Sequence, residues 1–423
     1  MTMIDRRLLL RSLGLGVAAV VLPLPAFART SASIVIVGGG FGGASAARML
    51  ATLLPSASIT LIDANSVYTA CPFSNLVIGT DRANSAQQFG YDGLQAAGVE
   101  VINAVVSDVD SEMRTVTLQD GTAVPYDRLI LSPGIEMRWG AIEGYDEDAA
   151  GTFPHAWKAG AQTLLLRQKL QTLEDGETVI MSVPPAPFRC PPGPYERASL
   201  IAHYLKSHKP RSKLIILDAK DSFSKMALFQ EAWAEHYPDH LEWRGASNDG
   251  TVSSVDVAAG TVQTDFETFA APAINVIPPQ QSGTIAQRAG VSDATGWCPI
   301  EPLAFESTLQ PNIHVIGDAT IAAPMPKSAF SANLQAKICA IGVARLLSGL
   351  KVESTVLANT CYSFTTPQEA ISIAGVYSNE NGVLESISGA GGVSPLGADT
   401  TVRTQEAAQA RSWYATITAE AFG

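Results

Sequence analysis

The chain has 423 residues, of which 46% are hydrophobic and 16% are charged, and its formal net charge is −12 at pH 7. A chain of this length can form two or three domains with proper cores, and the composition is typical of an ordinary globular protein. The acidic balance disfavours nucleic acid as a partner and suits a basic protein partner.

Residues 1–28 are predicted to be a twin-arginine signal peptide. Arg-Arg-Leu-Leu-Leu-Arg at 6–11 precedes an apolar run at 13–22 and a small-residue cleavage site at 26–28. The apolar run is too short to span a bilayer and no second one is long enough, so we expect no stable membrane insertion. Because this route exports folded proteins, we expect cofactor loading before export and residence in the periplasm, where disulfides persist.

A strand, a glycine-rich turn, a helix and a second strand then follow in the order typical of dinucleotide-binding proteins. The apolar segment 33–37 leads into a G-x-G-x-x-G motif and a helical stretch at 44–54, and a second strand at 58–62 ends in an aspartate. Glycines allow close backbone approach to a pyrophosphate, and the carboxylate can accept a hydrogen bond from a ribose hydroxyl. The candidate cofactor-binding residues are Gly38, Gly40, Gly43 and Asp63.

Two later segments favour FAD over NAD. Residues 124–134 look like the strand and turn that close the first FAD segment of two-dinucleotide flavoproteins, and residues 312–319 resemble their late FAD motif. Each could instead be a buried strand followed by a turn, but three such segments in this order argue for FAD. They add Pro133, Gly134, Gly317 and Asp318 to the cofactor-binding candidates.

A second α/β unit at 156–275 lacks the features of a nicotinamide site. Its strand-like segments are 177–181 and 213–217, and the turn after the first reads Ser-Val-Pro-Pro-Ala-Pro at 182–187. Proline has a fixed φ and no N–H, so this turn cannot bind a pyrophosphate as glycines do. We therefore expect electrons to enter from a substrate other than NAD(P)H.

Several further blocks are more specific than the glycine motif. They are Cys71-Pro72-Phe73-Ser74-Asn75, Tyr91-Asp92-Gly93-Leu94, Pro154 to Gly160, Phe188 to Ala198, Gly296-Trp297-Cys298-Pro299, Pro324 to Ser328 and Asn359 to Ser363. With these blocks the chain resembles the flavoprotein subunit of flavocytochrome c sulfide dehydrogenase and its relatives in sulfur-oxidation gene clusters.

We expect an α/β fold with two Rossmann-like dinucleotide-binding domains of the glutathione-reductase type and a small C-terminal α+β domain. The FAD domain is predicted at 30–155 and 276–350, and a degenerate NAD-like domain at 156–275 is inserted between its two parts. The C-terminal domain, at 351–423, is expected to contain strands and a helix around 404–419.

The resemblance implies roles for three cysteines. Cys71 matches a family cysteine joined to FAD by a thioether, and Cys190 and Cys361 match the two cysteines of a redox disulfide beside the flavin. The family oxidises sulfide to sulfur or polysulfide and passes electrons to a c-type cytochrome subunit, and we expect the same activity here. In an exported protein, the pair could instead be a structural disulfide.

Neighbouring residues complete the predicted site. Arg189 is expected to favour anionic sulfur and lower the pKa of the adjacent thiol, and Glu196 to move protons between substrate and solvent. Either could instead be a surface salt-bridge partner or a helix cap. Lys327 and Ser328 open a predicted helix at 329–347, whose N-terminus is expected to point towards the flavin and stabilise negative charge there.

The remaining cysteines are given structural roles. Cys298 lies in a Trp-Cys-Pro turn, and Cys339 lies in the apolar helix, where a cysteine behaves as a small hydrophobe. No histidine is spaced as a metal ligand and no C-x-x-C-H motif is present. We therefore expect no metal site, and any haem belongs to a partner chain.

Three alternative functions remain. A quinone-reducing sulfide oxidoreductase would share the flavin and the cysteines, but it needs a membrane-seating apolar C-terminus that the sequence lacks. An NADH-linked flavin reductase needs the missing glycine motif. A non-catalytic flavoprotein that docks on and reactivates a periplasmic sulfur-oxidising enzyme system is compatible with the sequence.

Overall fold

The predicted FAD domain (30–155 and 276–350) is called the first unit below, and a parallel sheet forms its core. The computed structural model describes residues 31–423, so the predicted signal peptide lies outside the described residues. The parallel strands of this sheet are, in spatial order, β21 (Ile313–Val315), β9 (Arg128–Leu131), β1 (Ser33–Val37), β2 (Ser58–Asp63) and β5 (Glu100–Asn103). Segments far apart in the chain therefore share one sheet.

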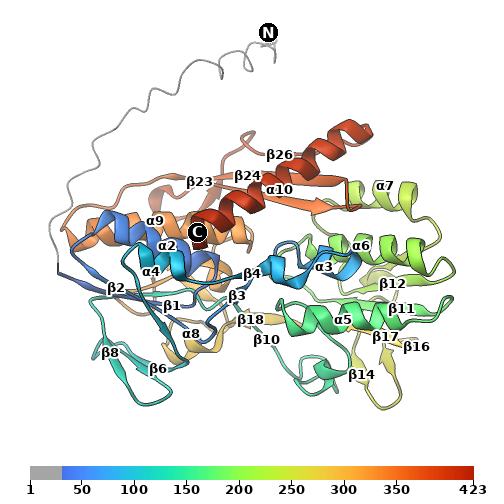
Figure 1. Ribbon diagram of the computed structural model, residues 1–423, viewed down its shortest axis with the longest axis horizontal. Helices are drawn as coiled ribbons and strands as arrows, with labels where there is room; N and C mark the ends of the chain where they lie inside the picture. The colour runs from blue at the N-terminus through green and yellow to red at the C-terminus, as the bar shows by residue number, and fades with distance from the viewer. Residues whose placement is uncertain (1–30) are drawn as a thin grey trace, which may run out of the picture.

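Both faces of this sheet are buried, which explains the unbroken apolar run in β1. Ile34 and Ile36 pack under the helices α2 (Phe41–Leu53) and α9 (Ala329–Leu347), which lie together on one face (Figure 1). Val35 and Val37 point to the other face, where a three-stranded antiparallel sheet and a short helix cover them.

The predicted inserted domain (156–275), called the central unit below, contains a second parallel sheet. Its strands are, in spatial order, β13 (Leu241–Arg244), β12 (Lys213–Asp218), β11 (Thr178–Val183) and β17 (Ala273–Val276). Its helices are α5 (Ala161–Thr172), α6 (Gly193–His208) and α7 (Met226–His236). After β11 the chain does not enter a helix directly, because the proline-rich loop intervenes and α6 begins only at Gly193.

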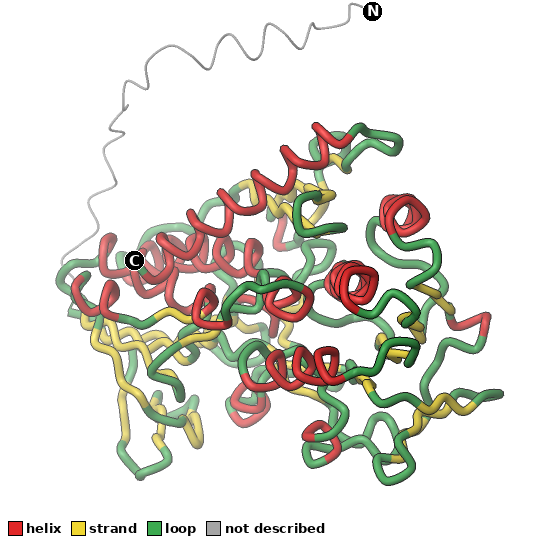
Figure 2. The backbone as a smooth tube through the Cα atoms, turned by 45° about the vertical axis from the view of Figure 1, so that its right-hand side comes forward, coloured by secondary structure: helices red, strands yellow, loops and turns green. Residues whose placement is uncertain are grey.

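The predicted C-terminal domain (351–423), called the C-terminal unit below, packs against both other units. The hairpin of β23 (Val356–Phe364) and β24 (Ala370–Ser378) carries α10 (Thr400–Phe422) across it. In Figures 1 and 2, α10 runs over the first unit at its C-terminal end and towards α7 at its N-terminal end. The unit shares the hydrophobic core of α2 and α9, so it is packed as part of the first unit rather than as an appendage.

Short elements complete the fold. The remaining helices are α3 (Ser74–Gly79), α4 (Asp92–Ala96) and α8 (Thr284–Arg288). The remaining strands are β3 (Tyr68–Thr69), β4 (Gln88–Phe89), β6 (Val106–Asp110), β7 (Thr115–Leu118), β8 (Ala123–Pro125), β10 (Ile135–Met137), β14 (Ser254–Asp256), β15 (Thr261–Gln263), β16 (Thr268–Ala270), β18 (Gln280–Ser282), β19 (Cys298–Glu301), β20 (Glu306–Ser307), β22 (Thr320–Ile321), β25 (Glu385–Ser386) and β26 (Gly392–Val393).

The predicted α/β class is confirmed, and the helix predicted at 329–347 has the bounds of α9. The helix predicted at 404–419 is longer at both ends. It begins at Thr400 because Asp399 caps it, its Oδ1 accepting a hydrogen bond from the Val402 N–H at 3.0 Å. The domain boundaries remain predictions.

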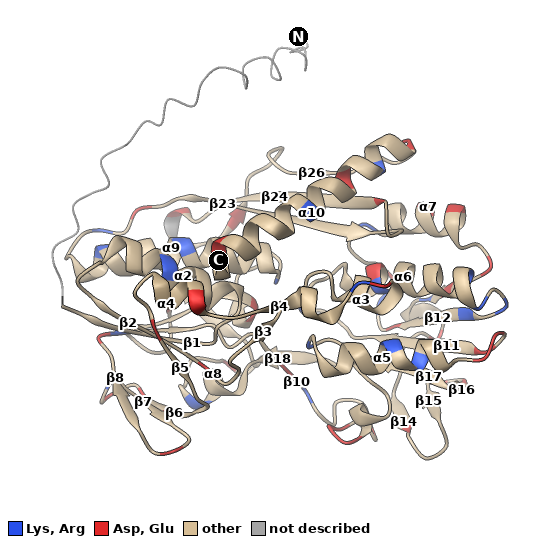
Figure 3. Ribbon diagram, in the orientation of Figure 1, with Lys and Arg blue, Asp and Glu red and all other residues tan. Residues whose placement is uncertain are grey.

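Charged residues are dispersed over the molecule. Figure 3 shows basic and acidic residues interspersed over all three units of the described chain. The acidic residues, 40 against 28 basic ones in the full sequence, are thus not confined to one unit.

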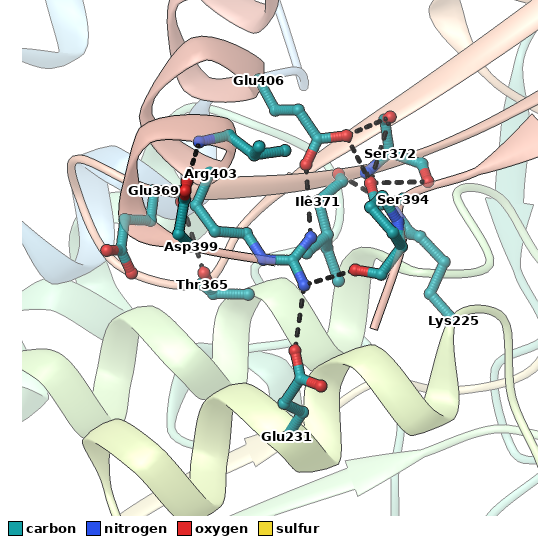
Figure 4. A network of polar contacts seen from close by, with 12 residues as sticks. Lys225, Glu231, Thr365, Glu369, Ile371, Ser372, Ser394, Asp399, Arg403 and Glu406 are labelled. Carbon is teal, nitrogen blue, oxygen red and sulfur yellow. Dashed lines mark hydrogen bonds and ion pairs between the residues drawn. The ribbon is translucent and has the colours of Figure 1, made fainter. Parts of the chain in front are cut away.

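A buried ion-pair network fastens α10 to α7 (Figure 4). The Arg403 side chain is 9% exposed, and its Nη2 donates to Glu231 Oε1 at 2.9 Å and to the Pro395 carbonyl at 2.8 Å. Its Nη1 lies 3.4 Å from Glu406 Oε2, and Glu406 Oε1 accepts a hydrogen bond from Ser372 Oγ at 2.8 Å. The network therefore links α7, β24 and α10.

Replacing Arg403 with Met should loosen this junction, because Glu231 and Glu406 lose their cation. Charged hydrogen bonds of this kind contribute about 2 kcal/mol. Amide exchange in α10 and β24 should therefore become faster by roughly thirtyfold, measured by hydrogen exchange with mass spectrometry. Gln409→Met, at an exposed position of the same helix, is the control. Equal protection in both variants would contradict the assigned role of the network.

Candidate active site

A cavity of about 620 Å³ lies where the three units meet. Its wall includes the glycine turn after β1, Cys71 between β3 and α3, Cys190 just before α6, and Cys361 on β23. The structure thus gathers around one space the glycine motif and the three cysteines that the sequence singles out separately.

The glycine turn has the geometry of a phosphate site. Gly38 has φ +100°, and a Cβ there would lie 2.3 Å from the Ser132 carbonyl oxygen. A Cβ on Gly43 would lie 1.8 Å from the Gly38 carbonyl oxygen, so this glycine permits the close packing of α2 on β1. Gly40 precedes α2 without a side-chain cap, which leaves the first amides of the helix free for an anion.

The predicted carboxylate stands beside this turn. Asp63 ends β2, lines the cavity and accepts a hydrogen bond from the Gly39 N–H at 2.5 Å. It is therefore held in place at the edge of the turn, where a ribose hydroxyl can reach it.

The rest of the cavity wall fits an extended flavin dinucleotide. Pro133, Gly134, Gly317 and Asp318, the later candidates for cofactor binding, all line it. The Oδ1 atom of Asp318 is buried without a hydrogen-bond partner, and burial raises the pKa of this carboxyl. Because a buried acceptor without a partner is costly, a hydroxyl-bearing ligand such as the ribityl chain of FAD fits here.

Cys190 and Cys361 reach the cavity from different units. Cys190 has a positive φ of 55°, and its backbone N–H donates to the Lys327 carbonyl at 2.8 Å, which ties the proline-rich loop to the first unit. Cys361 lies in the middle of β23, paired with Ile373 of β24, and is 8% exposed. Both are free thiols in this structure. Burial raises the pKa of each thiol, Glu196 disfavours the thiolate of both, and Cys361 further disfavours the thiolate of Cys190.

Glu196 lies in the first turn of α6, inside the protein rather than on its surface. Its Oε1 accepts a hydrogen bond from the Phe364 N–H at 2.9 Å, and its Oε2 accepts one from Asn75 Nδ2 at 2.7 Å. Burial raises the pKa of this carboxyl. It lines the cavity and is thus a candidate proton carrier, and the alternatives of a surface salt bridge or cap do not apply.

A fully buried arginine holds this arrangement, and sequence reasoning missed it. Arg197 is 1% exposed, and it donates to Asn75 Oδ1 at 3.1 Å, to Asn275 Oδ1 at 3.0 Å and to the His155 carbonyl at 2.9 Å. Burial lowers the pKa of Arg197 to about 9. Since Asn75 in turn binds Glu196, Arg197 fixes the carboxylate from behind. Nothing in the sequence distinguishes it from an exposed helical arginine.

The expected effect of Arg189 on the neighbouring thiol has the predicted direction but is outweighed. Its guanidinium lies 4.0 Å from Asp318 Oδ2 and donates to the Trp157 carbonyl. It does favour the Cys190 thiolate, but burial is the largest influence, and Cys361 and Glu196 oppose the charge as well. The pKa of Cys190 is therefore raised rather than lowered.

Lys327 and Ser328 divide the role predicted for them. The Ser328 side chain lines the cavity and caps α9, accepting a hydrogen bond from the Ser331 N–H at 3.0 Å. The Lys327 ammonium is not part of the cavity wall. It donates to the Asp318 carbonyl at 2.9 Å and lies 3.8 Å from the centre of the Trp297 ring, so it holds the Asp318 segment from outside the cavity.

The other predicted residues have the expected surroundings. Cys71 Sγ lies 3.9 Å from the Trp157 carbonyl oxygen, at the wall of the cavity. Cys298 and Cys339 are fully buried, as their structural roles require. Within residues 31–423 no cluster of metal-ligating side chains is found, and no helix is long and apolar enough to cross a membrane.

Comparisons with known proteins agree with this site. Residues 163–278 match the family model for the central part of the sulfide dehydrogenase (flavocytochrome c) flavoprotein chain. Residues 353–422 match the flavin-binding model of flavocytochrome c sulphide dehydrogenase, and residues 32–171 match the pyridine nucleotide-disulphide oxidoreductase model. The flavin-binding match and the glycine turn together indicate FAD as the cofactor.

The curated relatives include two electron-acceptor classes. A sulfide dehydrogenase flavoprotein chain from Chlorobaculum thiosulfatiphilum is 54% identical over 44 residues, which cover 10% of this chain and 92% of that sequence. A mitochondrial sulfide:quinone oxidoreductase from Dictyostelium discoideum is 23% identical over 67% of this chain and 64% of its own length. A sulfide-quinone reductase from Aquifex aeolicus is 31% identical over 43% of this chain and 41% of its own length.

Solved structures share the fold across most of the chain. The sulfide:quinone oxidoreductase of Aquifex aeolicus superposes with a TM-score of 0.71 at 18% identity, covering 92% of each chain. A ferredoxin reductase from Rhodopseudomonas palustris gives 0.62 at 17% identity, covering 81% of this chain and 82% of its own. By these matches, and with a glycine turn and three cysteines around one cavity, the chain belongs to the flavoprotein family of flavocytochrome c sulfide dehydrogenase.

Proposed function

We propose that the chain is an FAD-dependent sulfide dehydrogenase that oxidises sulfide to sulfur or polysulfide and passes the electrons to a c-type cytochrome. The observation that carries this proposal is the meeting of Cys190 and Cys361 at the wall of a cavity that also contains the dinucleotide turn. Two thiols brought together from different units can form a disulfide, and a disulfide is the group that a soft nucleophile such as hydrosulfide attacks.

The first step of the proposed sulfur chemistry needs no oxidant other than the disulfide itself. Hydrosulfide attacks one sulfur of the Cys190–Cys361 disulfide, the S–S bond breaks, and a new S–S bond forms. The products are a persulfide on one cysteine and a thiolate on the other, and the attacking sulfur has lost two electrons to the pair. FAD bound in the cavity supplies a two-electron acceptor that can release electrons singly to a haem.

Glu196 and Cys71 serve this chemistry in different ways. Glu196 lines the cavity beside β23 and is proposed to take a proton from the bound sulfur species, and its raised pKa, caused by burial, strengthens it as a base. Cys71 is proposed to hold FAD through a thioether, which its place on the cavity wall supports. Arg189 lies between Asp318 and the Trp157 carbonyl and orients the wall there.

The compartment and the acceptor complete the proposal. The twin-arginine leader supports residence in the periplasm, where c-type cytochromes are the matching acceptors. A quinone acceptor is the second candidate, which the similarity to sulfide:quinone oxidoreductases favours. In either case the proposed electron donor is sulfide rather than NAD(P)H, because the proline-rich loop after β11 offers no site for a nicotinamide cofactor.

Serine at Cys190 or at Cys361 should leave FAD bound and stop the reaction with sulfide. The expected result is normal flavin absorbance on purification and bleaching by sulfide at least a hundredfold slower than in the unmodified protein, measured anaerobically by stopped flow. Cys298→Ala, a buried cysteine away from the cavity wall, should bleach normally. Rapid bleaching in both serine variants would refute the proposed role of the pair.

Serine at Cys71 should separate covalent attachment from binding. Acid-precipitated unmodified protein should stay yellow and give a flavin mass on the peptide that contains Cys71. The Cys71→Ser protein should purify with flavin but lose it on precipitation, because the glycine turn still binds the dinucleotide. A colourless pellet from the unmodified protein would disprove the thioether.

A further inference from the structure

Lys225 is a buried cation that joins the central unit to the strand of Cys361. It lies in the turn before α7 with φ +63°, and its side chain is 8% exposed. Its Nζ donates to the Cys361 carbonyl at 2.9 Å, to Ser363 Oγ at 2.9 Å and, in Figure 4, towards the Ile371 carbonyl at 3.4 Å. The ammonium thus contacts both β23 and β24.

The hydrogen-bond partners of this ammonium are all neutral. The anionic or ionisable groups that face it are Cys361 on β23, Cys190 before α6, Glu196 on α6 and Glu406 on α10. Burial lowers the pKa of Lys225 to about 8, while these groups favour its charge. A lysine without a directly bound carboxylate is costly to bury, and such groups are concentrated at functional sites.

The Cys361 sulfur itself has a side-chain donor. Asn359 Nδ2 donates to Cys361 Sγ at 3.2 Å, and Asn359 Oδ1 is itself held by the hydroxyls of Ser328 and Ser331. Lys225 is the strongest of the influences that favour the Cys361 thiolate. Glu196 disfavours the anion of both cysteines, and Lys225 favours both, but Lys225 is the leading favourable influence only at Cys361, since Arg189 leads at Cys190.

We propose that Lys225 is a positioning residue that holds Cys361 opposite Cys190 and stabilises negative charge on the Cys361 sulfur whenever the pair is open. This inference rests on the proposed function, in which attack by hydrosulfide breaks the S–S bond and leaves an electron pair on a cysteine sulfur. The ammonium offsets that charge without giving up its proton, so no acid is needed at this position.

The competing explanation is that Lys225 only clamps the C-terminal unit in place. Other contacts of α7 do that without facing the cysteines. Glu231 binds Arg403 at 2.9 Å, His236 Nε2 lies 2.9 Å from Glu369 Oε2, and the Tyr237 hydroxyl donates to the Thr365 carbonyl at 2.9 Å. Glu231 therefore offers a matched control at the same interface.

The test measures the acidity of Cys361 directly in the flavin-loaded full chain. In a Cys190→Ser background, the rate of alkylation of Cys361 by iodoacetamide is followed against pH by peptide mass. Adding Lys225→Met should move the midpoint up by at least one pH unit, which is a tenfold loss of reactivity below the midpoint. Lys225→Arg should restore the profile, and Glu231→Gln should leave it unchanged.

A second readout uses the native cysteine pair. In a glutathione redox buffer, Lys225→Met should lower the ratio of reduced to disulfide form by about tenfold, equivalent to a potential about 30 mV more negative. Unchanged ratios and pH midpoints, or equal shifts in Glu231→Gln, would overturn the inference in favour of a clamp. Neither readout uses sulfide, so failure of the proposed function would be seen separately, as sulfide oxidation that survives loss of Cys190 or Cys361.

Discussion

The site depends on the docking of the β23–β24 hairpin against the central unit. Cys190 and Cys361 lie in separate units, so the sulfur chemistry proposed for them requires this junction to be closed. The junction is made of buried polar contacts: Lys225 to the hairpin, and the Phe364 N–H to Glu196 at 2.9 Å. Buried contacts of this kind strongly favour one arrangement of the two units, because a buried polar group that loses its hydrogen-bond partner destabilises the protein.

The proline-rich loop after β11 is the second determinant. In a dinucleotide-binding unit, the first strand passes through a glycine turn directly into a helix whose amides bind phosphate. Here the strand leads to prolines, and the chain then reaches the first unit, where the Cys190 N–H binds the Lys327 carbonyl and the Arg189 N–H donates to Gln280 Oε1 at 3.0 Å. The loop that would bind a nicotinamide nucleotide instead carries a cysteine to the flavin cavity.

Local patterns were sufficient for much of this structure. The glycine spacing, the acid at the end of β2 and the apolar strands depend on short-range chemistry, and they predict the first unit closely. The roles of Arg197 and Lys225 depend on burial by segments far away in the chain, and their immediate sequence resembles that of exposed helix ends. The net pKa of Cys190 could not be predicted from the sequence for the same reason. A neighbouring arginine is visible in the sequence, whereas the desolvation that outweighs it is not.

The central claim is that sulfide supplies electrons through the cysteine pair to a haem acceptor. The most direct measurement is anaerobic mixing of the flavin-loaded protein with sulfide and oxidised c-type cytochrome, beside a parallel reaction with a water-soluble quinone. The account predicts sulfide-dependent cytochrome reduction that requires both Cys190 and Cys361 and exceeds quinone reduction. Quinone reduction without cytochrome reduction, or no sulfide-dependent reduction of either acceptor, would contradict it.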